Sequence, residues 1–271
     1  MTGWTGQGEA AALRPESQPL IAPSQPSVVS VSGRQLMVQK RQPDGSLAAP
    51  TPYVIKGIDW TPATRAPANG DNPLDPHNPA DQVQYGFFFH WPGRNPDGPD
   101  VMNYWLKQEI PAHVQTDAAL MAQMNVNTVR IYSDLGTDPA VYQKVLDAFY
   151  NNGIMVIMTV AGSAADITSG QYVTTVNLCK NHPAILMWSI GNEWNFNNPY
   201  LFGYSSIGAA NAAVNQAAQA IKTSDPNHPV TSSLGDKWTS SNQSCPPDQA
   251  GSDIPSIVSQ VNNVDIWGIN A

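Results

Sequence analysis

The sequence predicts an α/β fold built on a parallel β-sheet. From residue 53 onward, one unit recurs: an apolar β-rich run, a loop, an amphipathic helix and the next apolar run. The runs are almost continuously apolar, as expected for strands covered on both faces. Acidic, basic, amide and aromatic side chains follow the carboxyl ends of these runs, the edge of the sheet at which parallel α/β folds place their active and binding sites.

The segments before this repeat are of two kinds. Residues 1–27 are rich in Pro, Gln and Ser and are predicted to be a flexible leader. Residues 28–52, which include "VVSVSGRQLMVQKRQPDGS", alternate as strands do and contain a Pro-Asp-Gly turn. We expect a short β-hairpin that closes one end of a single domain spanning 28–271.

Six strands and five helices are predicted after the hairpin. The strands are residues 53–60, 127–133, 154–160, 185–192, 229–235 and 264–271. The helices are residues 114–124, 138–152, 170–181, 206–224 and 253–263. In the second helix, Asp138 suits the N-cap, Pro139 the first turn and Gly153 the position after the last turn.

The composition excludes several classes of partner. The chain has 271 residues, enough for one large domain with a substantial core. Its net charge of −8 leaves no basic surface for a phosphate backbone, so nucleic acid is not an expected partner. Apolar runs such as 154–162 are far shorter than the roughly 20 residues of a membrane span. Many uncharged polar residues and 8 Trp suit a neutral, hydroxylated ligand such as a carbohydrate.

Location and thiol state follow from weaker signals. The first residues lack the basic start and apolar segment of a signal peptide, so the protein is expected to be cytoplasmic unless a secretory leader is missing. Cys179 precedes the amino end of the fourth strand, whereas Cys245 follows the carboxyl end of the fifth. Two free thiols are therefore expected, because a disulfide needs Cα atoms within about 7 Å.

The candidate binding residues lie after the strands. They are Asp59, Trp60, Arg130, Tyr132, Asp134, Asp166, Asn192, Glu193, Trp194, Asp236 and Trp238. A long insertion, about 61–112, projects from the same edge and contains "GFFFHWPGRNPDG", with His90 and Trp91. A loop of this length is more often functional than idle and would wall a cleft.

Glu193 stands out because it ends the apolar run "ILMWSIGNEWN". A carboxylate there is either the first solvated residue after a strand or a group kept for chemistry. Cleavage of a glycosidic bond needs one carboxylic acid to protonate the leaving oxygen and a second carboxylate to attack or to activate water. Apolar neighbours raise the pKa of a carboxyl group, which suits Glu193 for the acid role. The Asn192 amide could bind a sugar hydroxyl, and the flat ring of Trp194 could stack on a sugar.

The motif resembles a known group of enzymes. "NHPAILMWSIGNEWN" is similar to the fourth-strand signature of clan A glycoside hydrolases, particularly the β-galactosidase-type barrel of family 2. "KGIDW", residues 125–160 and "VDIWGINA" resemble other strands of that clan, and of β-1,3-glucanosyltransferases. The resemblance implies a (β/α)8 TIM barrel, with Glu193 as acid/base and Arg130 beside the nucleophile.

One departure from the family bears on activity. The family's nucleophile is a Glu at the end of the seventh strand, whereas this chain ends on the sixth. Its glutamates are Glu9, Glu16, Glu109 and Glu193, and only the last matches a catalytic position. We therefore expect an incomplete barrel of about six βα units, without its nucleophile. Its exposed sheet edges leave three alternatives open: the chain is a fragment of a longer barrel, a homo-oligomer covers the edges, or the fold closes differently.

Alternatives remain open at this level. The chain is either a glycosidase or transglycosylase of β-linked saccharides, or an inactive carbohydrate-binding or structural barrel fragment. Glu193 could instead pair with Asp59, Asp134 or Asp236. The tryptophans Trp60, Trp91, Trp194 and Trp238 either line a cleft or pack loops, and Trp188 and Trp267 are expected in the core. No cofactor is expected, and neither the Asp-rich stretch 69–82 nor the five His residues have metal-ligand spacing.

Overall fold

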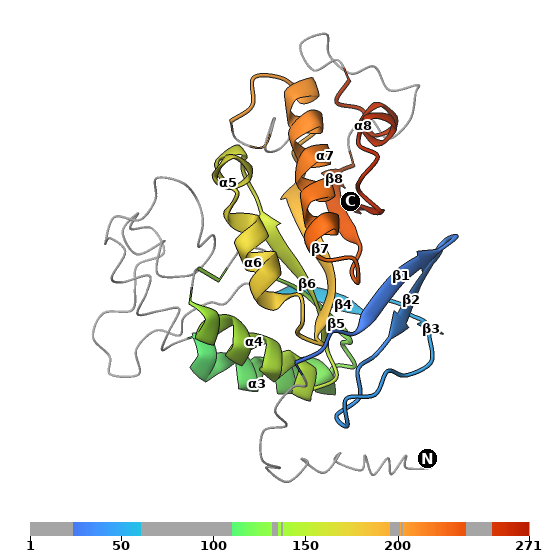
Figure 1. The fold of residues 1–271 in the computed structure, drawn as a ribbon, viewed down its shortest axis with the longest axis vertical. Helices are drawn as coiled ribbons and strands as arrows, with labels where there is room; N and C mark the ends of the chain where they lie inside the picture. The colour runs from blue at the N-terminus through green and yellow to red at the C-terminus, as the bar shows by residue number, and fades with distance from the viewer. Residues whose placement is uncertain are drawn as a thin grey trace, which may run out of the picture.

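A six-stranded parallel sheet forms the centre of the molecule (Figure 1). The computed structural model describes residues 24–60, 110–131, 135–136, 138–195, 201, 203–236 and 251–270. The strands are β4 (Gly57–Trp60), β5 (Thr128–Ile131), β6 (Met155–Ala161), β7 (Ile185–Asn192), β8 (Val230–Gly235) and β9 (Ile266–Asn270). Each pairs in parallel with the next in chain order. This order confirms the predicted βα repeat. The sheet curls into a half-barrel.

The helices pack on one face of this sheet. They are α3 (Ile110–Gln123), α4 (Pro139–Asn151), α5 (Ala164–Ser169), α6 (Gln171–Cys179), α7 (Ile207–Ser224) and α8 (Ile254–Gln260). The main core forms between them and the outward side chains of the strands, with Val156 and Met158 of β6 fully buried. In α4 the predicted N-cap is confirmed, because the Asp138 carboxylate accepts a bond from the Ala140 amide.

The short helix α5 is absent from the prediction. Ser163 and Asp166 form a reciprocal capping box at its start, in which each side chain accepts the other residue's backbone amide. Gly170, at φ 71°, then turns the chain directly into α6. The left-handed conformation at Gly170 separates two helices where the sequence pattern predicts a loop and one helix.

A separate antiparallel sheet precedes the barrel strands. It contains β1 (Val28–Ser32), β2 (Gln35–Gln39) and β3 (Thr51–Pro52) in that order. The predicted hairpin is confirmed, but its turn lies at Gly33, at φ 60°, between β1 and β2. The Pro-Asp-Gly segment forms a second turn, in which the Asp44 carboxylate accepts bonds from the amide and hydroxyl of Ser46.

This small sheet covers the helix-free face at the amino ends of the parallel strands. Val29 and Val38 pack with Met155, Leu186 and Met187 in a second hydrophobic cluster. Since Met155 begins β6 and Leu186 lies near the start of β7, the cluster marks the amino-terminal end of the half-barrel. The hairpin thus packs against that end of the half-barrel.

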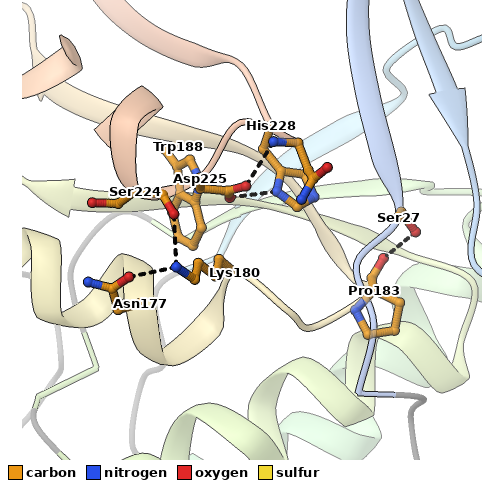
Figure 2. Close-up of polar contacts among 9 residues, drawn as sticks. Ser27, Asn177, Lys180, Pro183, Trp188, Ser224, Asp225 and His228 are labelled. Atoms are coloured by element: carbon orange, nitrogen blue, oxygen red, sulfur yellow. Dashed lines mark hydrogen bonds and ion pairs between the residues drawn. The ribbon is translucent and has the colours of Figure 1, made fainter. Parts of the chain in front are cut away.

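A buried polar network holds the same end together (Figure 2). The Asp225 carboxylate lies 2.7 Å from Nδ1 of His228 and accepts a 2.8 Å bond from the Trp188 indole. Both partners of the Asp225–His228 pair are almost completely buried. Nearby, the Ser27 hydroxyl donates to the Pro183 carbonyl at 2.8 Å and ties the first segment to the loop before β7. Trp188 is thus a core residue, as predicted.

The sheet has open edges at β4 and β9 within the described part of the chain. Large apolar side chains are exposed there: Val54, Ile55 and Ile58 at or near β4, and Ile269 on β9. Cys179 is buried and free, and Cys245 lies outside the described residues. None of the helices described is long and apolar enough to cross a membrane.

Candidate active site

Glu193 follows the last residue of β7 in an unusual backbone turn. Gly191 has φ 68° and Glu193 has φ 48°, in the left-handed region that non-glycine residues rarely adopt. The pairing of β7 with β8 also shifts register between Ser189 and Asn192. The Glu193 amide still donates to the Ser233 carbonyl at 2.9 Å, so the backbone of Glu193 is fixed to the end of the sheet.

The side chain of Glu193 belongs to a chain of hydrogen bonds that crosses the sheet. Nη2 of Arg130, on β5, donates to Oδ1 of Asn192 at 3.1 Å. Nδ2 of Asn270, on β9, donates to the same Oδ1 at 3.0 Å and to Oε1 of Glu193 at 2.9 Å. The structure therefore brings together the three predicted residues Arg130, Asn192 and Glu193.

Burial around this chain of bonds suits proton transfer. Asn192 is buried, whereas Arg130, Glu193 and Asn270 are half-buried, so the carboxyl group is both held and within reach of a ligand. A carboxyl group at the open end of a parallel sheet can donate or accept a proton on a bound molecule. No set of three His, Cys, Asp or Glu residues in the described ranges is arranged to hold a metal ion.

Two other predicted residues lie on the edge strand β4. Asp59 is exposed and pairs in register with Arg130, so both side chains face the same side of the sheet. Trp60 is only 5% exposed, and its indole donates to the Asp117 carboxylate at 3.0 Å. Its ring also meets the Phe149 ring edge-on, with 5.2 Å between the ring centroids. Of the two alternatives that the sequence leaves open for Trp60, the structure therefore favours packing over a place on the wall of a sugar cleft.

Trp194 likewise differs from its prediction as a stacking surface. Its side chain is fully buried, and the indole donates to the Ser232 hydroxyl at 3.0 Å. The Ser232 hydroxyl in turn donates to the Ile190 carbonyl at 2.7 Å. The left-handed turn at Glu193 sends the next side chain back into the core, so Trp194 supports the turn and does not face a ligand.

Tyr132, His90, Trp91 and Trp238 lie outside the described residues. Conversely, Asn270 was not predicted as a site residue. A neutral amide near the end of an apolar strand gives little signal by itself, and only the order of the strands places it beside Glu193.

Comparison with known proteins agrees with this architecture. The model of glycosyl hydrolases family 2, TIM barrel domain, matches residues 157–248, which include Asn192 and Glu193. The endo-1,4-beta-mannanase from Rhizomucor miehei superposes with a TM-score of 0.52 at 16% identity, over 89% of this chain and 70% of that chain. The endo-1,4-beta-mannanase from Eisenia fetida superposes with a TM-score of 0.50 at 14% identity, over 90% of this chain and 72% of that chain. No curated protein matches the sequence significantly.

These findings concern the fold and the family resemblance. At such low identity the two mannanase structures establish the fold alone: the six parallel strands of the described residues form part of a TIM barrel. The match over 157–248 confirms the resemblance that the motifs indicate. The chain is therefore similar to the clan A glycoside hydrolases, and in particular to the TIM barrel domain of family 2.

Proposed function

We propose that this protein is a retaining β-glycoside hydrolase or transglycosylase that acts on a β-linked oligosaccharide or polysaccharide. The observation that carries the proposal is the position of Glu193, at the carboxyl end of β7 and hydrogen bonded within the Arg130–Asn192–Asn270 network. The family match over the same strand supports a glycosidase function in general.

Glu193 acts twice in the proposed reaction. It first protonates the glycosidic oxygen, which departs as a hydroxyl as its bond to the anomeric carbon breaks, while a nucleophilic carboxylate that these 271 residues do not contain bonds that carbon and forms the glycosyl-enzyme intermediate. As a carboxylate, it then takes a proton from water, or from an acceptor hydroxyl in transglycosylation, as that oxygen attacks the same carbon. The Arg130 guanidinium stabilises the nucleophile's negative charge, and Asn192 binds a hydroxyl next to the cleaved bond.

Other side chains complete the proposed sugar site. Asp59 lies exposed beside Arg130 and accepts sugar hydroxyls. Tyr132, His90, Trp91 and Trp238 are proposed contacts from the loops beyond the strands, where aromatic rings offer flat surfaces to a sugar. Trp60 and Trp194 are left out because both side chains are buried.

The test separates the acid role of Glu193 from general damage. The chain is extended by two βα units, with a glutamate at the end of the first added strand. The extended protein is assayed on aryl β-glycosides with good and poor leaving groups. Glu193→Gln should lower the rate about 100-fold or more on the poor leaving group, which needs protonation, and much less on the good one. Glu16→Gln, the same change in the sequence before the predicted hairpin, is the control. Equal rates for Glu193→Gln and wild type on the poor leaving group would refute the assignment.

One observation favours a second candidate function, carbohydrate binding without turnover. Glu193 is the sole glutamate among the residues that the structure describes, so no partner glutamate faces it there. Calorimetric titration of the chain with β-glucan, β-galactoside and β-mannan oligosaccharides addresses this alternative. Binding by this chain, together with an extended protein that remains inactive, would favour the binding function.

A further inference from the structure

The charged groups of Arg130 and Glu193 set which atoms donate and which accept in the hydrogen bonds around Glu193. A guanidinium can only donate, so Arg130 requires the oxygen of the Asn192 amide at 3.1 Å. An ionised carboxylate can only accept, so Glu193 requires the nitrogen of the Asn270 amide at 2.9 Å. The orientations of both amides are therefore fixed by charge, although oxygen and nitrogen look alike in shape.

Asn270 uses its two amide hydrogens on two different partners. One hydrogen bonds Oδ1 of Asn192 and the other bonds Oε1 of Glu193. If Oε1 carried a proton, Asn270 would have to turn its oxygen toward it and would lose the bond to Asn192. The network therefore favours a proton on Oε2 and keeps Oε1 as an acceptor.

The strand geometry explains why β9 reaches Glu193. Asn270 pairs in register with Gly235, the last residue of β8, which has no side chain to intervene. One layer below, Gly268 pairs with Ser233, and a Cβ atom at Gly268 would lie 2.9 Å from the Ser233 hydroxyl. Gly235 thus leaves room for the Asn270 side chain to extend over β8 to the end of β7, and Gly268 leaves room for the Ser233 hydroxyl.

We propose that Asn270 is a positioning residue that holds the Glu193 carboxyl group and selects Oε2 as its proton-carrying oxygen. This inference rests on the proposed function for its catalytic meaning, but the hydrogen bond itself is testable without activity. It adds the last described strand to the site, through a residue that touches Glu193 rather than the substrate.

The deciding experiment is carboxyl ¹³C NMR of the chain with labelled glutamate. The sequence has four glutamates, so the spectrum has few signals, and Glu193→Gln assigns that of Glu193. Asn270→Ala and Asn270→Asp should both shift the Glu193 signal, because neither side chain can donate to Oε1. Asn263→Ala is the matched control, since Asn263 bonds Asn215 away from the site.

The outcomes distinguish this inference from the proposed function. A Glu193 signal unchanged in Asn270→Ala, with the fold intact by circular dichroism, would overturn the positioning role whatever the activity. In the extended protein, Asn270→Ala should lower kcat about 10- to 100-fold while KM changes little. A shifted signal in a protein that hydrolyses no glycoside would leave the positioning role standing and refute the proposed function.

Discussion

The substitution Gly191→Ala tests whether Trp194 belongs to the core. Gly191 has φ 68°, and a Cβ atom there would lie 2.7 Å from Cδ1 of Trp194 and 2.9 Å from Cδ2 of Leu201. Both distances are shorter than real Cβ contacts, so the indole or the backbone has to move. If Trp194 instead swung out to meet a sugar, its conflict with the added Cβ atom would disappear and only the milder contact with the end of the Leu201 side chain would remain.

The magnitude has two parts. Placing Ala in the left-handed region costs about 1–2 kcal/mol. Overpacking a filled core costs about 1–3 kcal/mol more. Gly153 isolates the first part, because it has φ 74° and an added Cβ would meet nothing within 4 Å. We therefore expect Gly153→Ala to lower the free energy of unfolding by about 1–2 kcal/mol and Gly191→Ala by about 2–5 kcal/mol.

Urea unfolding followed by far-ultraviolet circular dichroism gives both free energies under the same conditions. The difference between the two variants reports the packing around Gly191 alone. Equal losses in Gly191→Ala and Gly153→Ala would refute the placement of Trp194 as a fixed core residue. A larger loss in Gly191→Ala would support it.

Three further predictions concern stability and reactivity. Burial alone would raise the pKa of the Asp225 carboxyl group, but its hydrogen bonds and the charge of His228 outweigh burial, so the pKa is lowered in the folded protein. The stability that this carboxylate contributes is therefore present above the pKa of the unfolded state and is lost as the pH falls from about 5. Urea unfolding should show this loss in the wild type and much less of it in Asp225→Asn, and identical acid dependence would contradict it. Burial raises the pKa of the Cys179 thiol to about 12. In Cys245→Ala, where Cys179 is the remaining cysteine, a thiol reagent at neutral pH should therefore react only after unfolding, and rapid labelling of the folded protein would contradict this. Asp138→Ala should lower the free energy of unfolding by about 1 kcal/mol, with Asp138→Ser close to wild type, and no loss in the alanine variant would argue against the cap.

Periodicity in the sequence predicted most of the fold. The apolar runs fall within a few residues of the observed strands, because strands covered on both faces must be apolar throughout. The cap at Asp138 was predictable because capping chemistry is local. The division of α5 from α6 was not, since it depends on the backbone conformation at Gly170.

The site was predicted less evenly. Glu193 and Asn192 were identified because a polar pair after an apolar run is visible along the chain. The burial of Trp194 depends on the register shift of β7 and the left-handed turn, which strand alternation does not reveal. Asn270 lies 77 residues after Glu193 and becomes its neighbour only through the pairing of β7, β8 and β9.

The small sheet at the amino end also constrains how the chain acquires its structure. Its first residues bond partners far along the sequence: the Ser27 hydroxyl meets the Pro183 carbonyl 156 residues away, and the Val29 amide donates to the Asn227 carbonyl. During synthesis Ser27 and Val29 emerge before their partners: Pro183 appears only after β6 has been made, and Asn227 only after β7. Such distant contacts slow folding, because the long loops between them must close before the contacts form. Docking of β1 is therefore a late event, and removing the residues before β2 should destabilise strands that are made long afterwards.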